Sequence, residues 1–382
     1  MSRPNEKIIP GSHKIILTHH RAAGDCLMFS SMLRDLKLLF PHLEIGFNCS
    51  FNELLEGHPY TNVLNPDDPD VSVISTGNSF INACDKGHHM SFDFLWYTIY
   101  KLAGYGIIDG TLTSLYKKLQ DPILAKQGFM SNRPCINITK KEKEIKWIED
   151  AYNIKRYWIV AAGGKHDFQT KIWGWSLFQD VIDYFDGFIK FVIIGKSGHI
   201  LNMNLKNCIY LTDKTSLRDL YHLSYHADGA ISGISFLMHL AGGLKNYKGI
   251  WLPCVNIKGA REQPSYTLYE NHQVLHTYGS FDCAGCWKGK VTEDQKIKDD
   301  DRICKYPSYI GDDGRKDVVP DCMAKITASD IIRAIQIYYQ GDIYQGAIDK
   351  YKKIKKLRDN YLEPIKDRLY KLKNIRKNLK NI

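Results

Sequence analysis

The feature that most constrains the fold is a strand, a tight turn and a helix encoded within residues 228–243. Small and apolar residues precede Gly233, and apolar residues at helical spacing follow from Phe236. Ser232 or Ser235 is placed to cap this helix, whose start would direct unpaired N–H groups and the positive end of the helix dipole to one point. Such a point suits a phosphate or diphosphate, although an ordinary strand-to-helix turn of an α/β sheet has the same pattern.

The same alternation of strand and helix opens the chain. Residues 13–20 have the pattern of a buried strand, residues 21–25 that of a turn, and apolar residues then follow at helical spacing as far as Leu39. Residues 43–47 are predicted to form a second strand, parallel to the first. Further along, residues 139–152 are predicted to form one charged amphipathic helix close to a domain junction.

A second α/β unit begins with a predicted strand at 157–162 and continues through 188–195 to the turn at 228–243. The sequence therefore predicts a second doubly wound domain with several glycine-rich strand ends. The turn Gly163-Gly164-Lys165 lacks the Gly-x4-Gly-Lys-Ser/Thr spacing of a nucleotide triphosphate loop. The nicotinamide fingerprint Gly-x-Gly-x-x-Gly is also missing from the first strand turns of both units, which argues against a dehydrogenase.

Composition and charge narrow the class of protein. A chain of 382 residues with 44% hydrophobic and 25% charged residues can bury two cores and is typical of a folded soluble protein. No run of 18 apolar residues occurs, and no apolar segment precedes Ile8, so we expect a cytoplasmic protein. Residues 350–382 hold 13 Lys and Arg against 3 Asp and Glu, and this net charge of +10 equals that of the whole chain.

Asp25 lies where the first predicted strand gives way to a helix. In open α/β sheets, ligands bind at the carboxyl ends of the strands, which is the edge where this residue falls. Asp25 can cap the helix, or it can serve as a general base, and the two roles are compatible because a capped carboxylate is also held rigidly.

Two similar α/β domains suggest a nucleotide-sugar transferase of the GT-B type, and four motifs give the resemblance a name. The chain resembles glycosyltransferase family 9, the ADP-heptose:lipopolysaccharide heptosyltransferase family, over residues 14 to 275. The matching motifs are Gly24-Asp25 after the first strand, Lys171-Ile-Trp173 at a helix start, Thr215-Ser-Leu-Arg-Asp-Leu220, and Ser232-Gly-Ile-Ser-Phe-Leu-Met-His-Leu-Ala241.

The resemblance implies inverting glycosyl transfer without a catalytic metal. Asp25 would deprotonate the acceptor hydroxyl, Lys171 would neutralise the donor diphosphate, and Ser235 would bind the same diphosphate at the helix start. The family usually carries an acidic residue at the position of Ile234, where it contacts the donor sugar, so ADP-heptose is the favoured donor but the sugar stays open. The donor-binding residues that we expect are Gly24, Gly163, Gly164, Lys165, Lys171, Thr215, Ser232, Gly233, Ser235 and His239.

Four cysteines form a Cys-x2-Cys-x17-Cys-x17-Cys pattern, at Cys283, Cys286, Cys304 and Cys322. This spacing, in a segment with few aliphatic residues, is typical of a structural tetrathiolate metal site, which accepts zinc or iron. The segment is similar to the iron finger of autotransporter protein heptosyltransferases. Reduced, unrelated thiols are the alternative.

The chain ends with two kinds of helical pattern. Residues 326–339 are predicted to form a helix capped by Thr327 or Ser329, and residues 351–382 form an amphipathic, lysine-rich pattern interrupted at Pro364. The basic pattern would suit helices that pack within the protein or on a second subunit, that lie on an anionic membrane surface such as the inner membrane, or that contact nucleic acid.

The expected organisation has four parts: an acceptor domain at 1–150, a nucleotide-sugar donor domain at 151–282, a four-cysteine metal finger at 283–325, and C-terminal helices with the basic tail at 326–382. The two large domains would face a cleft. The expected activity is transfer of a sugar to a hydroxyl on a glycan, lipid or protein, in a protein that can form homo-oligomers. Two alternatives remain: a bacteriophage-type enzyme that glycosylates hydroxymethylated bases in DNA, and a catalytically silent scaffold that kept the fold.

Overall fold

The computed structural model describes residues 6–76, 89–197, 205–291, 303–311 and 317–339. It divides into two compact units, Met1–Asp330 and Ile331–Ile382. Within the described residues, no helix is long and apolar enough to cross a membrane.

The first sheet is a parallel three-stranded sheet in the order β2-β1-β3. Its strands are β1 (Lys14–His19), β2 (Glu44–Cys49) and β3 (Val71–Ser75), and its two long helices are α1 (Ala23–Leu39) and α2 (Met90–Gly104). The predicted β-α-β opening is therefore confirmed.

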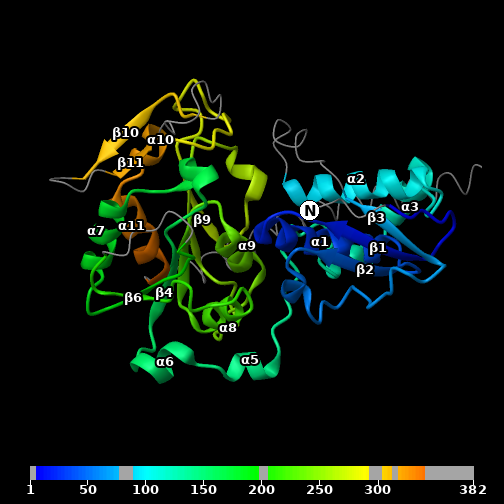
Figure 1. The fold of residues 1–382 in the computed structure, drawn as a ribbon, viewed down its shortest axis with the longest axis horizontal. Helices are drawn as coiled ribbons and strands as arrows, with labels where there is room; N and C mark the ends of the chain where they lie inside the picture. Colours follow the sequence, from blue (N-terminus) through cyan, green and yellow to red (C-terminus); the bar gives the residue numbers. More distant parts are fainter. Residues whose placement is uncertain (1–5, 77–88, 198–204, 292–302, 312–316, 340–382) are drawn as a thin grey trace, which may run out of the picture. The chain divides into compact units, whose positions relative to one another are not determined.

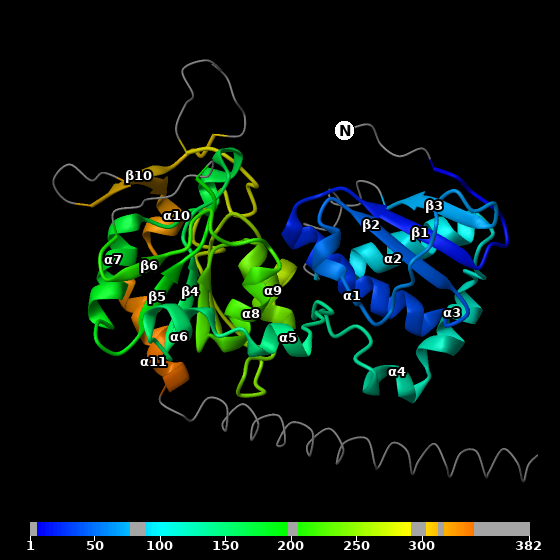
Figure 2. The ribbon, with the colours of Figure 1, turned by 60° about the horizontal axis from the view of Figure 1, so that its bottom comes forward.

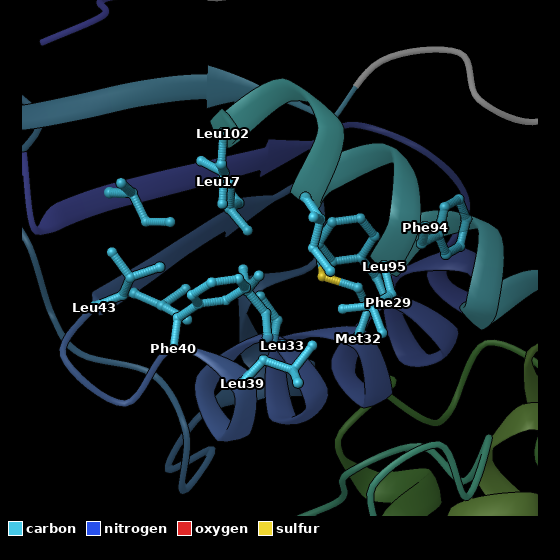
Figure 3. Packing of buried hydrophobic residues seen from close by; sticks show 14 of the residues in the cluster. Leu17, Phe29, Met32, Leu33, Leu39, Phe40, Leu43, Phe94, Leu95 and Leu102 are labelled. Atoms are coloured by element: carbon cyan, nitrogen blue, oxygen red, sulfur yellow. The ribbon is translucent and has the colours of Figure 1, made fainter. Parts of the chain in front are cut away.

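The core of this part lies between the sheet and the pair formed by α1 and α2. Leu17 from β1 meets Phe29 and Leu33 from α1, while Phe94 and Leu102 come from α2; all five side chains are buried (Figure 3). The strand alternation places Ile16 on the opposite face, in a small separate cluster. Burial of α1 on this face fixes the direction in which its N-terminus, and therefore Asp25, points.

The second sheet has six parallel strands in the order β6-β5-β4-β7-β8-β9. They are β4 (Tyr157–Ala161), β5 (Lys190–Ile193), β6 (Cys208–Tyr210), β7 (Gly229–Ser232), β8 (Cys254–Gly259) and β9 (His272–His276). Numbered along the sheet, this is the doubly wound order 3-2-1-4-5-6, which reverses direction between β4 and β7.

Helices cover both faces of the second sheet, with α7 (Trp175–Tyr184) on one side and α8 (Asp219–His226) and α9 (Phe236–Gly243) on the other (Figures 1 and 2). Strand alternation explains this: Ile159 and Val192 join the cluster under α8 and α9, whereas Trp158 and Phe191 point the opposite way. Together the two parallel sheets with their helices give the α/β architecture that the sequence predicted.

The shorter elements connect these sheets. They are η1 (Asn52–Leu55), α3 (Leu112–Leu119), α4 (Pro122–Lys126), α5 (Lys140–Glu144), α6 (Trp147–Tyr152), η3 (His166–Lys171), η4 (Pro264–Thr267), β10 (Pro307–Ile310), β11 (Asp317–Pro320), α10 (Asp321–Ala324) and α11 (Ala328–Tyr339).

Two expectations about helices were wrong. Residues 139–152 form two short helices, because Ile145 adopts an extended backbone between them. Ile145 and Tyr152 are exposed, whereas Ile148 is buried in the core and Trp147 packs against it. Lys171 does not open a helix but ends the 3₁₀ helix η3, and α7 begins four residues later at Trp175.

The start of α11 follows the sequence. Its cap is Thr327, whose side chain accepts from Asp330 N at 3.3 Å while the Asp330 carboxylate accepts from Thr327 N at 2.8 Å. Strands β10 and β11 pair as an antiparallel hairpin within the four-cysteine segment. The predicted basic tail lies outside the described residues.

Candidate functional site

The strand order of the second sheet locates the candidate site. Ala161 at the end of β4 is in register with Ser232 at the end of β7, and the sheet reverses direction between these two strands. In doubly wound sheets, ligands bind at the carboxyl ends of the strands beside this reversal. The segments that begin there are 163–165 and 233–235, both of which the sequence had singled out.

The N-terminus of α9 lies at this point. Ser235 is its N-cap residue, but its side chain does not bond to the first-turn N–H groups; its hydroxyl lies 2.6 Å from that of Ser232, which donates to Gly233 O at 2.8 Å. The prediction that Ser235 occupies the cap position is confirmed, whereas the side-chain cap bond is not formed. No cap side chain therefore occupies the N–H groups of the first turn, which suits the binding of an anion there.

Gly233 allows two segments to approach closely. A Cβ atom at this position would lie 2.7 Å from the carbonyl oxygen of Lys171. Any larger residue would push the end of η3 away from the turn that precedes α9. The glycine thus brings Lys171 beside the start of α9.

Lys171 has a markedly perturbed ammonium group. Burial, followed by the positive charge of Arg261, lowers the pKa of Lys171 to about 8, while Glu262 and Asp25 oppose this shift. Its Nζ lies 4.8 Å from the centre of the exposed Phe168 ring. The charged form of such a lysine becomes more stable when an anion binds beside it.

Asp25 is held at the start of α1. Its carboxylate accepts a hydrogen bond from Ala22 N at 3.2 Å, so it does cap the helix. Burial raises the pKa of Asp25 above its ordinary value, with Lys171 the largest opposing influence. A raised pKa makes this carboxylate a stronger base, which is what abstraction of a hydroxyl proton requires.

Gly24 and His239 join α1 to α9. A Cβ atom at Gly24 would meet the His239 ring at 2.7 Å. His239 is buried, its Nδ1 lies 2.8 Å from the Tyr269 hydroxyl, and burial keeps its pKa well below the ordinary value. His239 is therefore a neutral residue at the helix contact, and its expected role toward the donor stays a prediction.

The remaining predicted donor residues lie around this centre. Lys165 is exposed, yet its charge lowers the pKa of both Asp25 and Lys171. Gly164 lies against Ile172, at 3.5 Å from where its Cβ would be, and Gly163 precedes it at the end of β4. Thr215 adjoins Ser216, which exchanges hydrogen bonds with Asp219 at the start of α8, and its place in the donor site stays a prediction.

Three charged residues lie near the end of β8. Arg261 and Glu262 are buried and both act on the pKa of Lys171. In the sequence they stand in a loop that could line the acceptor or donor side, and packing is at least as good an explanation for them there. Lys258 was not anticipated: it is 1% exposed, donates to Thr267 Oγ1 at 2.6 Å, and burial lowers its pKa to about 8. The available signal was a lysine inside an apolar strand.

The four cysteines influence one another. Burial raises the pKa of Cys322 to about 11, and the other three thiols add to this shift. The Cys322 sulfur also accepts from the backbone of Ala260, and the Cys304 sulfur from the backbone of Tyr306. Among the described residues, however, no three His, Cys, Asp or Glu side chains are arranged to hold a metal ion.

Comparison with solved structures identifies the same fold in glycosyltransferases. TibC, an iron-containing dodecameric glycosyltransferase from enterotoxigenic E. coli H10407, is similar with a TM-score of 0.55 and 16% identity, covering 87% of this chain and 78% of TibC. TibC in complex with ADP-D-beta-D-heptose gives 0.54 at 15% identity over the same shares. A family 9 glycosyltransferase from Veillonella parvula gives 0.51 at 16% identity, covering 87% and 99%. No protein-family model and no curated protein matches the sequence.

Proposed function

We propose that this protein is a family 9 glycosyltransferase, which moves a sugar from a nucleoside diphosphate to a hydroxyl acceptor. One observation carries the proposal: Lys171, with its lowered pKa, and the uncapped start of α9 lie beside the carboxylate of Asp25 at the reversal of the second sheet. Sugar transfer needs positive charge and N–H donors beside the departing diphosphate, and a base close to the acceptor hydroxyl.

Each residue has a defined part in the reaction. Asp25 removes the proton of the acceptor hydroxyl as its oxygen attacks the anomeric carbon, and the nucleoside diphosphate departs with the electron pair of the broken glycosidic bond. Lys171 and the N–H groups of α9 stabilise the negative charge that develops on the departing diphosphate. Attack on the face opposite the leaving group inverts the anomeric configuration.

The favoured donor is ADP-linked heptose, and the acceptor is a hydroxyl on a glycan, lipid or protein. This choice rests on the motifs and on the fold shared with TibC, whose structure holds ADP-D-beta-D-heptose. Ile234 stands where the family usually has an acidic residue that contacts the donor sugar, so the identity of the sugar stays open.

We also propose a structural metal ion at Cys283, Cys286, Cys304 and Cys322. The chemistry of the donor set supports this: neighbouring thiols raise the pKa of Cys304 and Cys322, a cation would let them ionise, and backbone N–H donors already reach both sulfurs. Zinc or iron would satisfy this set, and a metal so enclosed would stabilise the fold and take no part in the transfer.

Calorimetric titration with ADP, GDP, UDP and CDP tests the donor site. We expect micromolar binding of one nucleotide, about −8 kcal/mol, most of it lost in Lys171→Ala. Lys155→Ala is the matched control, because this side chain is 79% exposed and lies near Glu149. Absence of binding to all four nucleotides would leave the fold and favour the scaffold alternative.

Elemental analysis and thermal unfolding test the metal. We expect about one equivalent of zinc or iron, and a fall in the unfolding midpoint when a strong chelator removes it. Cys283→Ser should reproduce this fall, whereas Cys208→Ser, outside the four-cysteine set, should keep the metal. A metal-free protein with an unchanged midpoint would remove this part of the proposal. TibC is dodecameric, so sedimentation of the same samples tests whether this chain forms oligomers.

A further inference from the structure

We propose that Arg261 is a second phosphate-binding residue, held beside Lys171 by the main chain that follows Cys286. The inference rests on the proposed donor site and deepens it, because it assigns the diphosphate to a pair of cations rather than to Lys171 alone.

Arg261 is anchored, not merely buried. It is 3% exposed, its Nε donates to Lys288 O at 2.9 Å, and its Nη2 lies 3.5 Å from Trp287 O. Its guanidinium lies over the Trp287 ring, 4.7 Å from the centre. These contacts fix the orientation of the planar donor fork, which matches the geometry of phosphate oxygens.

Arg261 and Lys171 share one aromatic neighbour. The Arg261 guanidinium lies 5.7 Å and the Lys171 ammonium 4.8 Å from the centre of the Phe168 ring. Among charged groups, Arg261 has the largest effect on the pKa of Lys171. Phe168 is 41% exposed, so the residue that both cations contact reaches the solvent. Two cations beside one partly exposed residue favour an anionic ligand.

Among the residues that the structure describes, Glu262 is a carboxylate close to more than one cation. Glu262 lies 3.7 Å from Arg261 and 3.9 Å from Lys258, and its Oε1 accepts from Thr267 at 3.0 Å. The Glu262 carboxylate is therefore shared between two cations, and neither its distance to Arg261 nor that to Lys258 is short enough for a hydrogen bond. Asp25 and Glu262 oppose the effect of Arg261 and Lys165 on the pKa of Lys171, which nevertheless stays lowered, and a diphosphate ester would add two negative charges beside these cations.

Residues 285–289 are hydrogen-bonded to both chain segments that carry the cations, the one at Arg261 and the one that ends at Lys171. Trp287 N donates to Arg261 O at 3.3 Å, and Gly285 N donates to Ala260 O at 2.9 Å. On the other side, Thr170 N donates to Gly289 O at 3.2 Å, and the Thr170 hydroxyl donates to Lys288 O. Trp287 takes up a left-handed backbone with φ 53°, an uncommon conformation for a large residue that this network maintains.

The test compares ligands that differ in their phosphates. Wild type, Arg261→Lys and Arg261→Met are titrated calorimetrically with the diphosphate of the preferred nucleoside, its monophosphate and inorganic pyrophosphate, at two salt concentrations. Arg156→Lys is the control, because this arginine lies near Asp228 and over Phe188, outside the site. Thermal unfolding without ligand verifies that each variant is folded.

We expect Arg261→Met to bind the diphosphate roughly 10- to 100-fold more weakly, the loss typical of one hydrogen-bonded charged partner. The monophosphate should lose less, the salt dependence of diphosphate binding should become shallower, and Arg261→Lys should fall between. A purely structural arginine would weaken all ligands equally. Equal weakening, or unchanged diphosphate affinity in a folded variant, would overturn this inference and leave the proposed function standing. Failure of wild type to bind any of these ligands would overturn both.

Discussion

The lowered pKa of Lys171 makes donor binding depend on pH in a direction that can be worked out. In the free protein, burial and Arg261 hold this pKa at about 8, so the ammonium begins to lose its proton just above neutral pH. A bound diphosphate favours the charged form and raises the pKa toward its ordinary value. Binding therefore takes up a proton, and affinity must fall as pH rises above 8.

The size of the effect follows from the same shift. If the ligand restores the ordinary lysine pKa, the affinity falls about tenfold between pH 7 and pH 9, or about 1.4 kcal/mol. In the protein without ligand, Lys165 and Arg261 lower the pKa of Lys171 while Glu262 and Asp25 raise it, and the value of about 8 includes all four effects. Raising the pH should thus weaken binding without unfolding the site.

Calorimetry with ADP-ribose measures this dependence, because its diphosphate has no proton to lose in that range. Lys171→Arg is the control: it stays charged throughout and should show a much flatter profile, with a residual slope from Lys258, whose pKa is also about 8. Equal affinity at pH 7 and pH 9 in wild type, or the same tenfold fall in Lys171→Arg, would refute the assignment of Lys171 to the diphosphate.

Three further predictions concern single residues. Lys171→Met should raise the free energy of unfolding near pH 7 by about 2 kcal/mol, because the folded state disfavours its charge below the lowered pKa; denaturant titration checks this, and a less stable variant would contradict it. Gly233→Ala should destabilise the protein by about 1–3 kcal/mol and weaken nucleotide binding, because its Cβ would lie 2.7 Å from Lys171 O. Gly104→Ala is the control: its Cβ would have no atom within 4 Å, so this variant should not be destabilised. Asp25→Asn should keep nucleotide affinity but lower turnover about 10²- to 10⁴-fold; wild-type turnover would show that Asp25 is not the base.

The sequence by itself determined the alternation of strands and helices and the places where chemistry can occur. Gly233 and Ser235 mark a strand-to-helix turn through local spacing, and Asp25 follows a buried strand in the same way. These signals are local, since a turn needs a glycine and a buried strand needs a run of apolar residues, whatever the rest of the chain does. The same local reasoning failed at 139–152, because helical spacing does not reveal that Ile145 is exposed and extended.

Only the tertiary structure decided which of these places lie together. Lys171 and Gly233 are 62 positions apart, and a single missing Cβ sets their approach. The importance of Arg261 and Lys258 comes from burial beside other charges: Arg261 acts on the pKa of Lys171, and burial lowers the pKa of Lys258. The pKa of each group depends on its distances to all neighbouring charges, and residue spacing along the chain does not give these distances. The electrostatic character of the site therefore arises only when the sheet is assembled.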